Sequence, residues 1–252
     1  MLNHSIRPSR RRAPVSRFVH AALAGDRTTA IKLAVDFMAE KRSRATVITD
    51  LFHGAQLQIG NRWHMGLATA ADEFRVSTAI VAAMVALPSP TVIDAVKAPS
   101  RILLATLWPE RHDLGVRLVG TALRDDGWVV DFAHGVEPVE LVNRAAQARM
   151  SLVGISSTFL VGQARAQLDA VVRSLHAIGV AVIVGGAAFV RAPRLAEEIG
   201  ADSSAADARS AVIVARRIQN GHRRLLSQLR VLPMFIPEVL DHIRDPLGSM
   251  LG

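Results

Sequence analysis

The sequence predicts an α/β protein with an all-α cap, in which a four-helix bundle precedes a doubly wound parallel sheet. Two observations support this prediction. Residues 17–87 show the apolar periodicity of amphipathic helices, whereas from residue 101 onward short β-favouring runs alternate with helical stretches that end near glycine. Such alternation is typical of a parallel sheet that has helices on both faces.

The helical half is interrupted at three places, which divides it into four helices. The interruptions are Gly25-Asp26, the region near 41–43, and the stretch from Gly60 to Gly66. Two apolar stripes at helical spacing predict that these helices share one core. The stripes comprise Ile48, Leu51, Phe52, Ala55 and Ile59 in one segment and Val76, Ile80, Met84 and Leu87 in another.

The second half contains five β-favouring runs, the last of which is weak. We expect strands at 101–107, 128–133, 151–156, 180–184 and 201–205. Three prolines between 88 and 100 indicate a linker before the first strand. The predicted organisation is a basic flexible tail (1–16), a helical-bundle cap (17–90), a linker (91–100), a sheet domain (101–220) and a C-terminal helix with an apolar tail (221–252).

The composition excludes several kinds of site. The chain has no cysteine, so a disulfide framework, a thiolate metal site and a cysteine nucleophile are excluded. A metal ligand must therefore be histidine or an oxygen donor. No apolar run reaches the roughly 20 residues that span a bilayer, and no apolar signal core follows the arginines near the N-terminus. We therefore expect a cytoplasmic protein without membrane contact.

The formal net charge is +8, and its excess lies in two basic segments, residues 7–17 and 216–230. Clustered arginines attract polyanions, but no helix-turn-helix or zinc module is visible to read bases. We expect these charges to be solvated and to bind nucleic acid only weakly or indirectly. The apolar segment 231–243 is expected to pack on its own domain, and a role in binding a partner is the alternative.

The loop after the first predicted strand carries the strongest chemical signal. Ligands of doubly wound sheets bind beyond the carboxyl ends of the strands, and His112 lies there, just before the next helix. Glu110 can accept the proton of one ring nitrogen of His112, which fixes the tautomer and makes the other nitrogen more basic. Ser156, at the end of the third strand, is expected to face the same loop. Gly115 and Gly185-Gly186 leave room for a long ligand.

Together these residues resemble the cobalamin-binding module of methionine synthase, of corrinoid methyl-transfer proteins and of light-sensing cobalamin regulators. The resemblance covers roughly residues 17–220 and implies a flavodoxin-like sheet domain. It is carried by Glu110-x-His112-x-x-Gly115, then Ser156-x-Thr158, then Gly185-Gly186.

In that family the dimethylbenzimidazole base leaves the cobalt, a histidine takes the lower axial position, and the nucleotide tail enters the sheet domain. The resemblance implies that His112 is the metal ligand and that Glu110 and Ser156 support it. The implied tail channel is lined by Gly115, Ser157, Thr158, Gly185 and Gly186, and the neighbouring Arg111, Asp113 and Leu114 are expected to contact the cofactor. Two residues depart from the family pattern: Glu110 replaces a common aspartate, as in the regulators, and Thr158 replaces a frequent leucine.

The helical half resembles the cap of CarH/AerR-type cobalamin photoreceptor regulators. Trp63, nine intervening residues and Glu73 reproduce most of a Trp-x9-Glu-His signature, and Phe74 stands in the place of the histidine. The resemblance implies that these residues cover the upper face of the cofactor. Phe74 cannot coordinate cobalt, and His64 is expected to be an exposed or capping residue. A large core residue is the alternative interpretation of Trp63.

Two functions are compatible with this pattern. The first is a sensory regulator, possibly light-responsive, that binds adenosylcobalamin and signals to a transcription regulator or another protein. The alternative is a corrinoid methyl carrier that works with methyltransferases and binds methylcobalamin or hydroxocobalamin. A relative that has changed or lost its cofactor is a third possibility. No base, nucleophile or phosphate loop stands out elsewhere, so we do not expect an enzyme that acts alone, and a homo-oligomer is compatible with either function.

Overall fold

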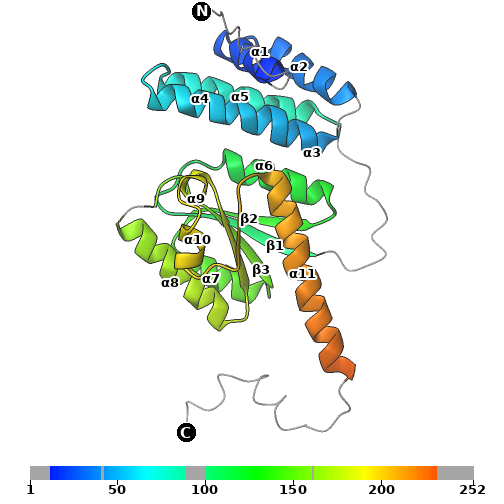
Figure 1. The fold of residues 1–252 in the computed structure, drawn as a ribbon, viewed down its shortest axis with the longest axis vertical. Helices are drawn as coiled ribbons and strands as arrows, with labels where there is room; N and C mark the ends of the chain where they lie inside the picture. The colour runs from blue at the N-terminus through cyan, green and yellow to red at the C-terminus, as the bar shows by residue number, and fades with distance from the viewer. Residues whose placement is uncertain (1–11, 41–42, 89–99, 161, 232–252) are drawn as a thin grey trace, which may run out of the picture. The chain divides into compact units, whose positions relative to one another are not determined.

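The computed structural model describes residues 12–40, 43–88, 100–160 and 162–231 (Figure 1). The chain divides into two units, residues 1–215 and 216–252. Most of the predicted basic tail, nearly all of the predicted linker and the apolar tail after residue 231 lie outside the described residues.

The N-terminal helices are α1 (Arg12–Leu23), α2 (Arg27–Ala39), α3 (Arg44–Thr46), the π-helical η1 (Val47–Phe52), α4 (His53–His64) and α5 (Ala70–Ala86). Asp26 caps α2 through a hydrogen bond from the Thr29 amide, and Thr69 and Asp72 form a reciprocal capping box at the start of α5. Because α3, η1 and α4 follow one another directly, residues 44–64 form one long helical segment.

The third helix ends later than the sequence predicts. Gly60 lies inside α4, which continues to His64, whereas the prediction placed a break from Gly60 onward. Ala55 and Ile59 are fully buried on the same helix. A glycine within a helix costs only about 1 kcal/mol relative to alanine, so the packing of this apolar face outweighs the glycine.

The second half is a parallel five-stranded sheet, as predicted. Its strands are β1 (Arg101–Leu107), β2 (Val129–Val136), β3 (Leu152–Ser156), β4 (Ala181–Gly185) and the short β5 (Ser203–Ala205). Their order is β2-β1-β3-β4-β5, and every neighbouring pair is parallel. The order therefore reverses between β1 and β3, the place where doubly wound sheets bind ligands.

Helices cover both faces of this sheet (Figure 1). They are α6 (Leu114–Asp125), α7 (Pro138–Gln147), α8 (Gln163–Ala177), α9 (Ala187–Arg191), α10 (Leu195–Glu198) and α11 (Ala208–Val231). α11 runs without interruption through residue 220, where the sequence predicted a domain boundary. Val171 and Leu175 of α8 pack in one core with Leu103 and Val153 of the sheet.

The other face of the sheet domain shares a core with the N-terminal helices. Leu118 and Ala122 of α6 belong to the same buried cluster as Phe52 of η1 and Ile80 of α5. The helical half therefore packs against α6, largely through apolar contacts.

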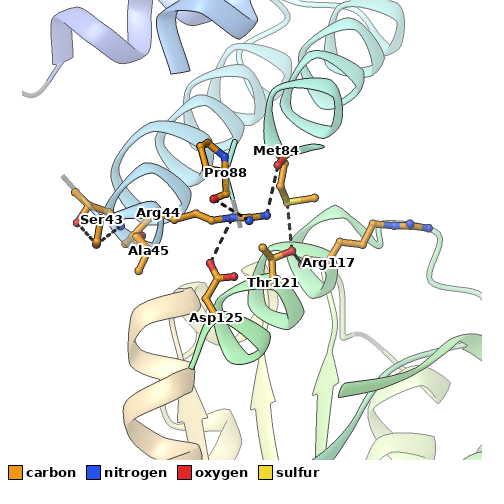
Figure 2. Close-up of polar contacts among 10 residues, drawn as sticks. Ser43, Arg44, Ala45, Met84, Pro88, Arg117, Thr121 and Asp125 are labelled. Carbon is orange, nitrogen blue, oxygen red and sulfur yellow. Dashed lines mark hydrogen bonds and ion pairs between the residues drawn. The ribbon is translucent and has the colours of Figure 1, made fainter. Parts of the chain in front are cut away.

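An ion pair lies within this contact between the two halves. Figure 2 shows Arg44 pointing from α3 toward Asp125 at the end of α6, with Nε 3.4 Å from Oδ2. The side chains are only 12% and 16% exposed. The guanidinium also donates to the carbonyl oxygens of Pro88 and Met84, at 3.2 and 3.5 Å. Burial raises the pKa of Asp125, and the charge of Arg44 opposes that rise.

Arg44→Met is expected to lower the free energy of unfolding by about 2–4 kcal/mol, because it leaves the Asp125 carboxylate buried without its cation. Since the pKa of Asp125 is raised in the folded state, the loss of unfolding free energy caused by Arg44→Met should be largest at neutral pH, where the carboxylate is charged. It should shrink as the pH falls toward the ordinary aspartate value of 3.8. Urea unfolding followed by circular dichroism at several pH values measures both effects.

The double variant Arg44→Met/Asp125→Leu is the control, because replacing both members of a buried pair by apolar groups is often nearly neutral. It should be more stable than Arg44→Met alone. Equal stability of Arg44→Met and the wild type would contradict the inferred importance of this pair.

Candidate functional site

The site begins at the loop that connects β1 to α6. The Glu110 carboxylate lies at its centre: Oε1 accepts the backbone amide of His112 at 3.0 Å and lies 2.7 Å from Nδ1 of its imidazole. The other carboxylate oxygen, Oε2, accepts the backbone amide of Thr158 at 2.7 Å. One carboxylate thus joins the loop after β1 to the loop after β3, across the switch point of the sheet.

This geometry fixes the orientation of the imidazole. With Nδ1–H donated to Glu110, the opposite nitrogen Nε2 carries the lone pair that a metal can bind. The His112 side chain is 52% exposed, so Nε2 is accessible to a metal. Burial alone would raise the pKa of Glu110. The two backbone amides and the imidazole outweigh that effect and lower the pKa below its ordinary value, which keeps the carboxylate charged.

Glu110→Gln should weaken ligand binding through His112 by about 10- to 100-fold, as is usual when the partner of a metal-bound histidine is altered. The glutamine oxygen can replace only one of the two carboxylate oxygens, so the NH2 group opposes the donor or donors that the other oxygen accepts. Titration with hydroxocobalamin followed by absorbance tests this. Glu140→Gln on α7, whose carboxylate pairs with Arg144 on the surface, is the control and should bind as the wild type does.

A first cavity, of about 110 Å³, lies on the face of the sheet that carries α6 and the start of α11. Apolar side chains form its interior, among them Ile102 and Leu104 of β1 and Ile183 of β4. Four of the predicted tail-channel and support residues line it, namely Gly115, Ser156, Gly185 and Gly186. We call this cavity the slot.

Glycine is required where the slot passes the ends of β3 and β4. Gly186 has a φ of +94°, and a Cβ there would lie 2.4 Å from the carbonyl oxygen of Ser157. A Cβ on Gly185 would lie 2.9 Å from the carbonyl oxygen of Ala205. A Cβ on Gly115 would meet nothing within 4 Å, so this glycine leaves open space rather than resolving a close contact.

A second cavity, of about 370 Å³, lies beside the histidine loop. His112, Arg111 and Ser157 line it together with the aromatic rings of Trp108 and Phe159. The Arg111 guanidinium lies 5.8 Å from the centre of the Trp108 ring. Ser156 lines both cavities, so the slot and the histidine cavity adjoin at the end of β3.

Some predicted residues lie elsewhere than expected. The Ser156 hydroxyl lies toward Gly186, 2.8 Å from where a Cβ would be, and the partner of Glu110 in this loop is the Thr158 amide instead. The Asp113 carboxylate accepts two hydrogen bonds from Arg117 at 2.9 and 2.6 Å. Leu114 packs in the core shared with the N-terminal helices. The residues that line the two cavities do not include Asp113, Leu114 or Thr158.

The predicted cap residues lie around the turn between α4 and α5. Trp63 is 43% exposed and Phe74 is 67% exposed, which excludes the interpretation of Trp63 as a buried core residue of this helical half. Glu73 accepts a hydrogen bond from Ser77 on the next turn of α5, at 2.6 Å. None of the three lines either cavity, so their place above a cofactor remains a prediction.

One glycine and three polar residues that line the slot were not among the predicted site residues. Gly154 lies in the middle of β3, where a Cβ would lie 2.6 Å from a methyl carbon of Leu104. A glycine inside a strand is itself a signal of close approach. His53 and Gln56 of α4 and Asp207 before α11 also line the slot. Nothing in their local sequence indicates this, because the packing of distant elements brings them there.

The described ranges of the chain contain no group of three histidine, aspartate or glutamate side chains placed to hold a metal ion. They also contain no helix of the length and apolar character needed to cross a bilayer.

Comparison with known proteins agrees with this architecture. Residues 100–213 match the family model of the B12 binding domain. The monomethylamine corrinoid protein of Methanosarcina barkeri superposes with a TM-score of 0.68 at 20% identity, over 82% of this chain and 99% of that one. This likeness shows that the α/β fold with its parallel sheet is shared, and the family match supports cobalamin as the ligand of the sheet domain.

Two other proteins are similar over different extents. The small subunit of 2-hydroxyisobutanoyl-CoA mutase from Aquincola tertiaricarbonis is 40% identical over 62 residues, which are 24% of this chain and 45% of that subunit. The chain therefore matches less than half the length of this curated relative. A cobalamin-binding protein from Desulfitobacterium hafniense aligns with a TM-score of 0.44 at 20% identity, over 81% of this chain and 98% of that one.

Proposed function

We propose that this chain is a corrinoid carrier, which holds cobalamin through His112 and presents it to a partner enzyme. The observation that supports this most directly is the Glu110–His112 pair, 2.7 Å apart, beside a slot with an apolar interior. A free metal site would need several protein ligands. A single oriented histidine suits a metal whose other ligands come from a macrocycle.

The residues fit the groups that a cobalamin offers. Nε2 of His112 would bind the cobalt, and Glu110 would hold the imidazole ring through Nδ1. The slot would take the displaced lower base, because its interior is apolar and glycines keep it open. Bound cobalt would supply the transfer chemistry, and His112, held by Glu110, would bind it through Nε2.

The names of the similar proteins favour the carrier over the sensor. One is a monomethylamine corrinoid protein and another is the small subunit of a mutase. By analogy, this chain would act with a separate catalytic subunit, such as a methyltransferase. The upper ligand of the cobalt would then be a methyl group or water, and the adenosyl group of adenosylcobalamin is the alternative.

A light-responsive regulator is the second candidate, and exposed Trp63 is the observation that favours it. Its ring, 43% exposed beside the turn from α4 to α5, is available to cover a cofactor. Phe74 in place of the family's histidine removes the upper ligand that such regulators form after illumination. The adenosylcobalamin form, a transcription regulator as partner and a change of oligomer all belong to this second candidate.

Reconstitution in the dark with methylcobalamin, hydroxocobalamin and adenosylcobalamin tests both candidates. The absorption spectrum and the elution volume on gel filtration are recorded before and after green light. A bound corrin whose protein keeps the same elution volume in light supports the carrier. A light-dependent change of assembly would favour the regulator. If none of the three cobalamins bound, both candidate functions would be refuted.

A further inference from the structure

Three polar residues at the slot are not explained by metal ligation. His53 and Gln56 come from α4 of the helical half, and Asp207 precedes α11 of the sheet domain. All three line the slot together with Gly115 and Ser156. The N-terminal helices therefore form part of the wall of a cavity that otherwise belongs to the sheet domain.

The spacing of the two α4 residues places them on one side of the helix. Residues three apart in a helix are neighbours on its surface, so His53 and Gln56 face the slot together. Ile48, one turn and a half earlier, also lines it. The neighbouring Gln58 lies on another side of α4, where its side-chain oxygen accepts a hydrogen bond from Ser16 of α1 at 3.4 Å.

The three residues offer mixed hydrogen-bonding groups. Burial lowers the pKa of His53, and the charge of Asp207 only partly opposes this, so the imidazole is neutral near pH 7. A neutral imidazole has one donor and one acceptor, and the Gln56 amide has both kinds of group. The Oδ1 atom of Asp207 accepts the amide and the hydroxyl of Ser210, at 2.7 and 2.9 Å. No hydrogen bond to its Oδ2 occurs within the described part of the chain.

The slot thus combines an apolar interior with polar groups of both kinds. Its volume of about 110 Å³ is of the same order as the ~150 Å³ cavity that accepts one benzene ring. The apolar interior suits part of a flat aromatic base, and the hydroxylated sugar attached to that base suits donors and acceptors such as His53, Gln56 and Asp207. A purely apolar ligand would offer no hydrogen bond to His53, to Gln56 or to Oδ2 of Asp207, which is unfavourable.

We propose that His53, Gln56 and Asp207 bind the sugar portion of the lower nucleotide and so make the protein selective for corrinoids that carry a complete nucleotide. This inference rests on the proposed function. It assigns a binding role to the N-terminal helices at the slot, separate from any cover over the upper face of the cofactor. It also explains why polar side chains of α4 line a slot whose interior is apolar.

The test compares cobalamin with cobinamide, which has the corrin ring and cobalt but no nucleotide. Dissociation constants are measured by absorbance titration for the wild type, for His53→Leu/Gln56→Met and for the control Gln58→Met. The wild type should bind cobalamin more tightly than cobinamide. The double variant should lose about tenfold or more in affinity for cobalamin, as expected for two lost hydrogen bonds, and should keep its affinity for cobinamide.

Equal affinities of the wild type for the two corrinoids would overturn the inference. So would unchanged cobalamin binding in the folded double variant, or a loss that is equal for cobalamin and cobinamide. Circular dichroism checks folding, and if the double variant unfolds, Gln56→Met alone is measured, for which a selective loss of about threefold or more is expected. Failure of the wild type to bind either corrinoid would instead refute the proposed function.

Discussion

His112→Ala is expected to remove the nitrogen that this chain offers to cobalt and to lower its affinity for cobalamin by at least about tenfold. The imidazole is held by Glu110 at 2.7 Å and is half exposed, so no rearrangement of the loop is needed for Nε2 to reach a metal. In the variant, water would replace the imidazole, and the absorption spectrum of the bound corrin should shift accordingly.

Electron paramagnetic resonance identifies the ligand directly. The reduced cobalt(II) form shows a splitting from its axial nitrogen, and this pattern should change when the protein is labelled with nitrogen-15. A pattern that does not respond to the label would mean that the nitrogen belongs to the cofactor's own base. His20→Ala, an exposed histidine on α1, is the matched control and should preserve both spectrum and affinity. An unchanged spectrum in His112→Ala would show that another ligand is used.

The sheet was predictable because its strands carry local signals. β1 was predicted with the bounds that it has, and the weak run at 201–205 contains the short β5. Ile102 to Ala105 are all buried, and an unbroken apolar run of this length is typical of a strand covered on both faces. The end of α4 was harder to predict, because the buried Ile59 is stabilised by contacts with distant helices that no local pattern records.

The candidate site was predictable to the extent that its residues follow strands. The Glu110–His112 contact involves residues two positions apart on one loop, so the spacing alone suggested it. The Thr158 amide was not predicted as the second partner of Glu110, because the choice between Ser156 and Thr158 depends on how the loop after β3 turns. His53 lies more than fifty residues before the loop, and only the packing of α4 against the sheet domain brings it to the slot.

Gly115→Leu is expected to fill the slot and to lower the affinity for cobalamin by about a hundredfold, while cobinamide still binds. A Cβ at this position meets nothing within 4 Å, and the residue lines the slot at the second position of α6. A leucine side chain can therefore occupy the space that the lower base would need. Loss of the contacts of one buried aromatic group, at about 25 cal/mol per Å² of apolar surface, accounts for an effect of this size.

The same substitution should leave the fold intact, because glycine is a poor helix former and leucine favours a helix by up to about 1 kcal/mol. Thermal unfolding should therefore occur at the same temperature as in the wild type or higher, which separates a blocked slot from a damaged protein. Gly221→Leu, at an exposed position of α11 that lines neither cavity, is the matched control and should bind cobalamin normally. If Gly115→Leu bound cobalamin as tightly as the wild type, the lower base would have to lie outside the slot, and the selectivity assigned to His53 and Gln56 would fail with it.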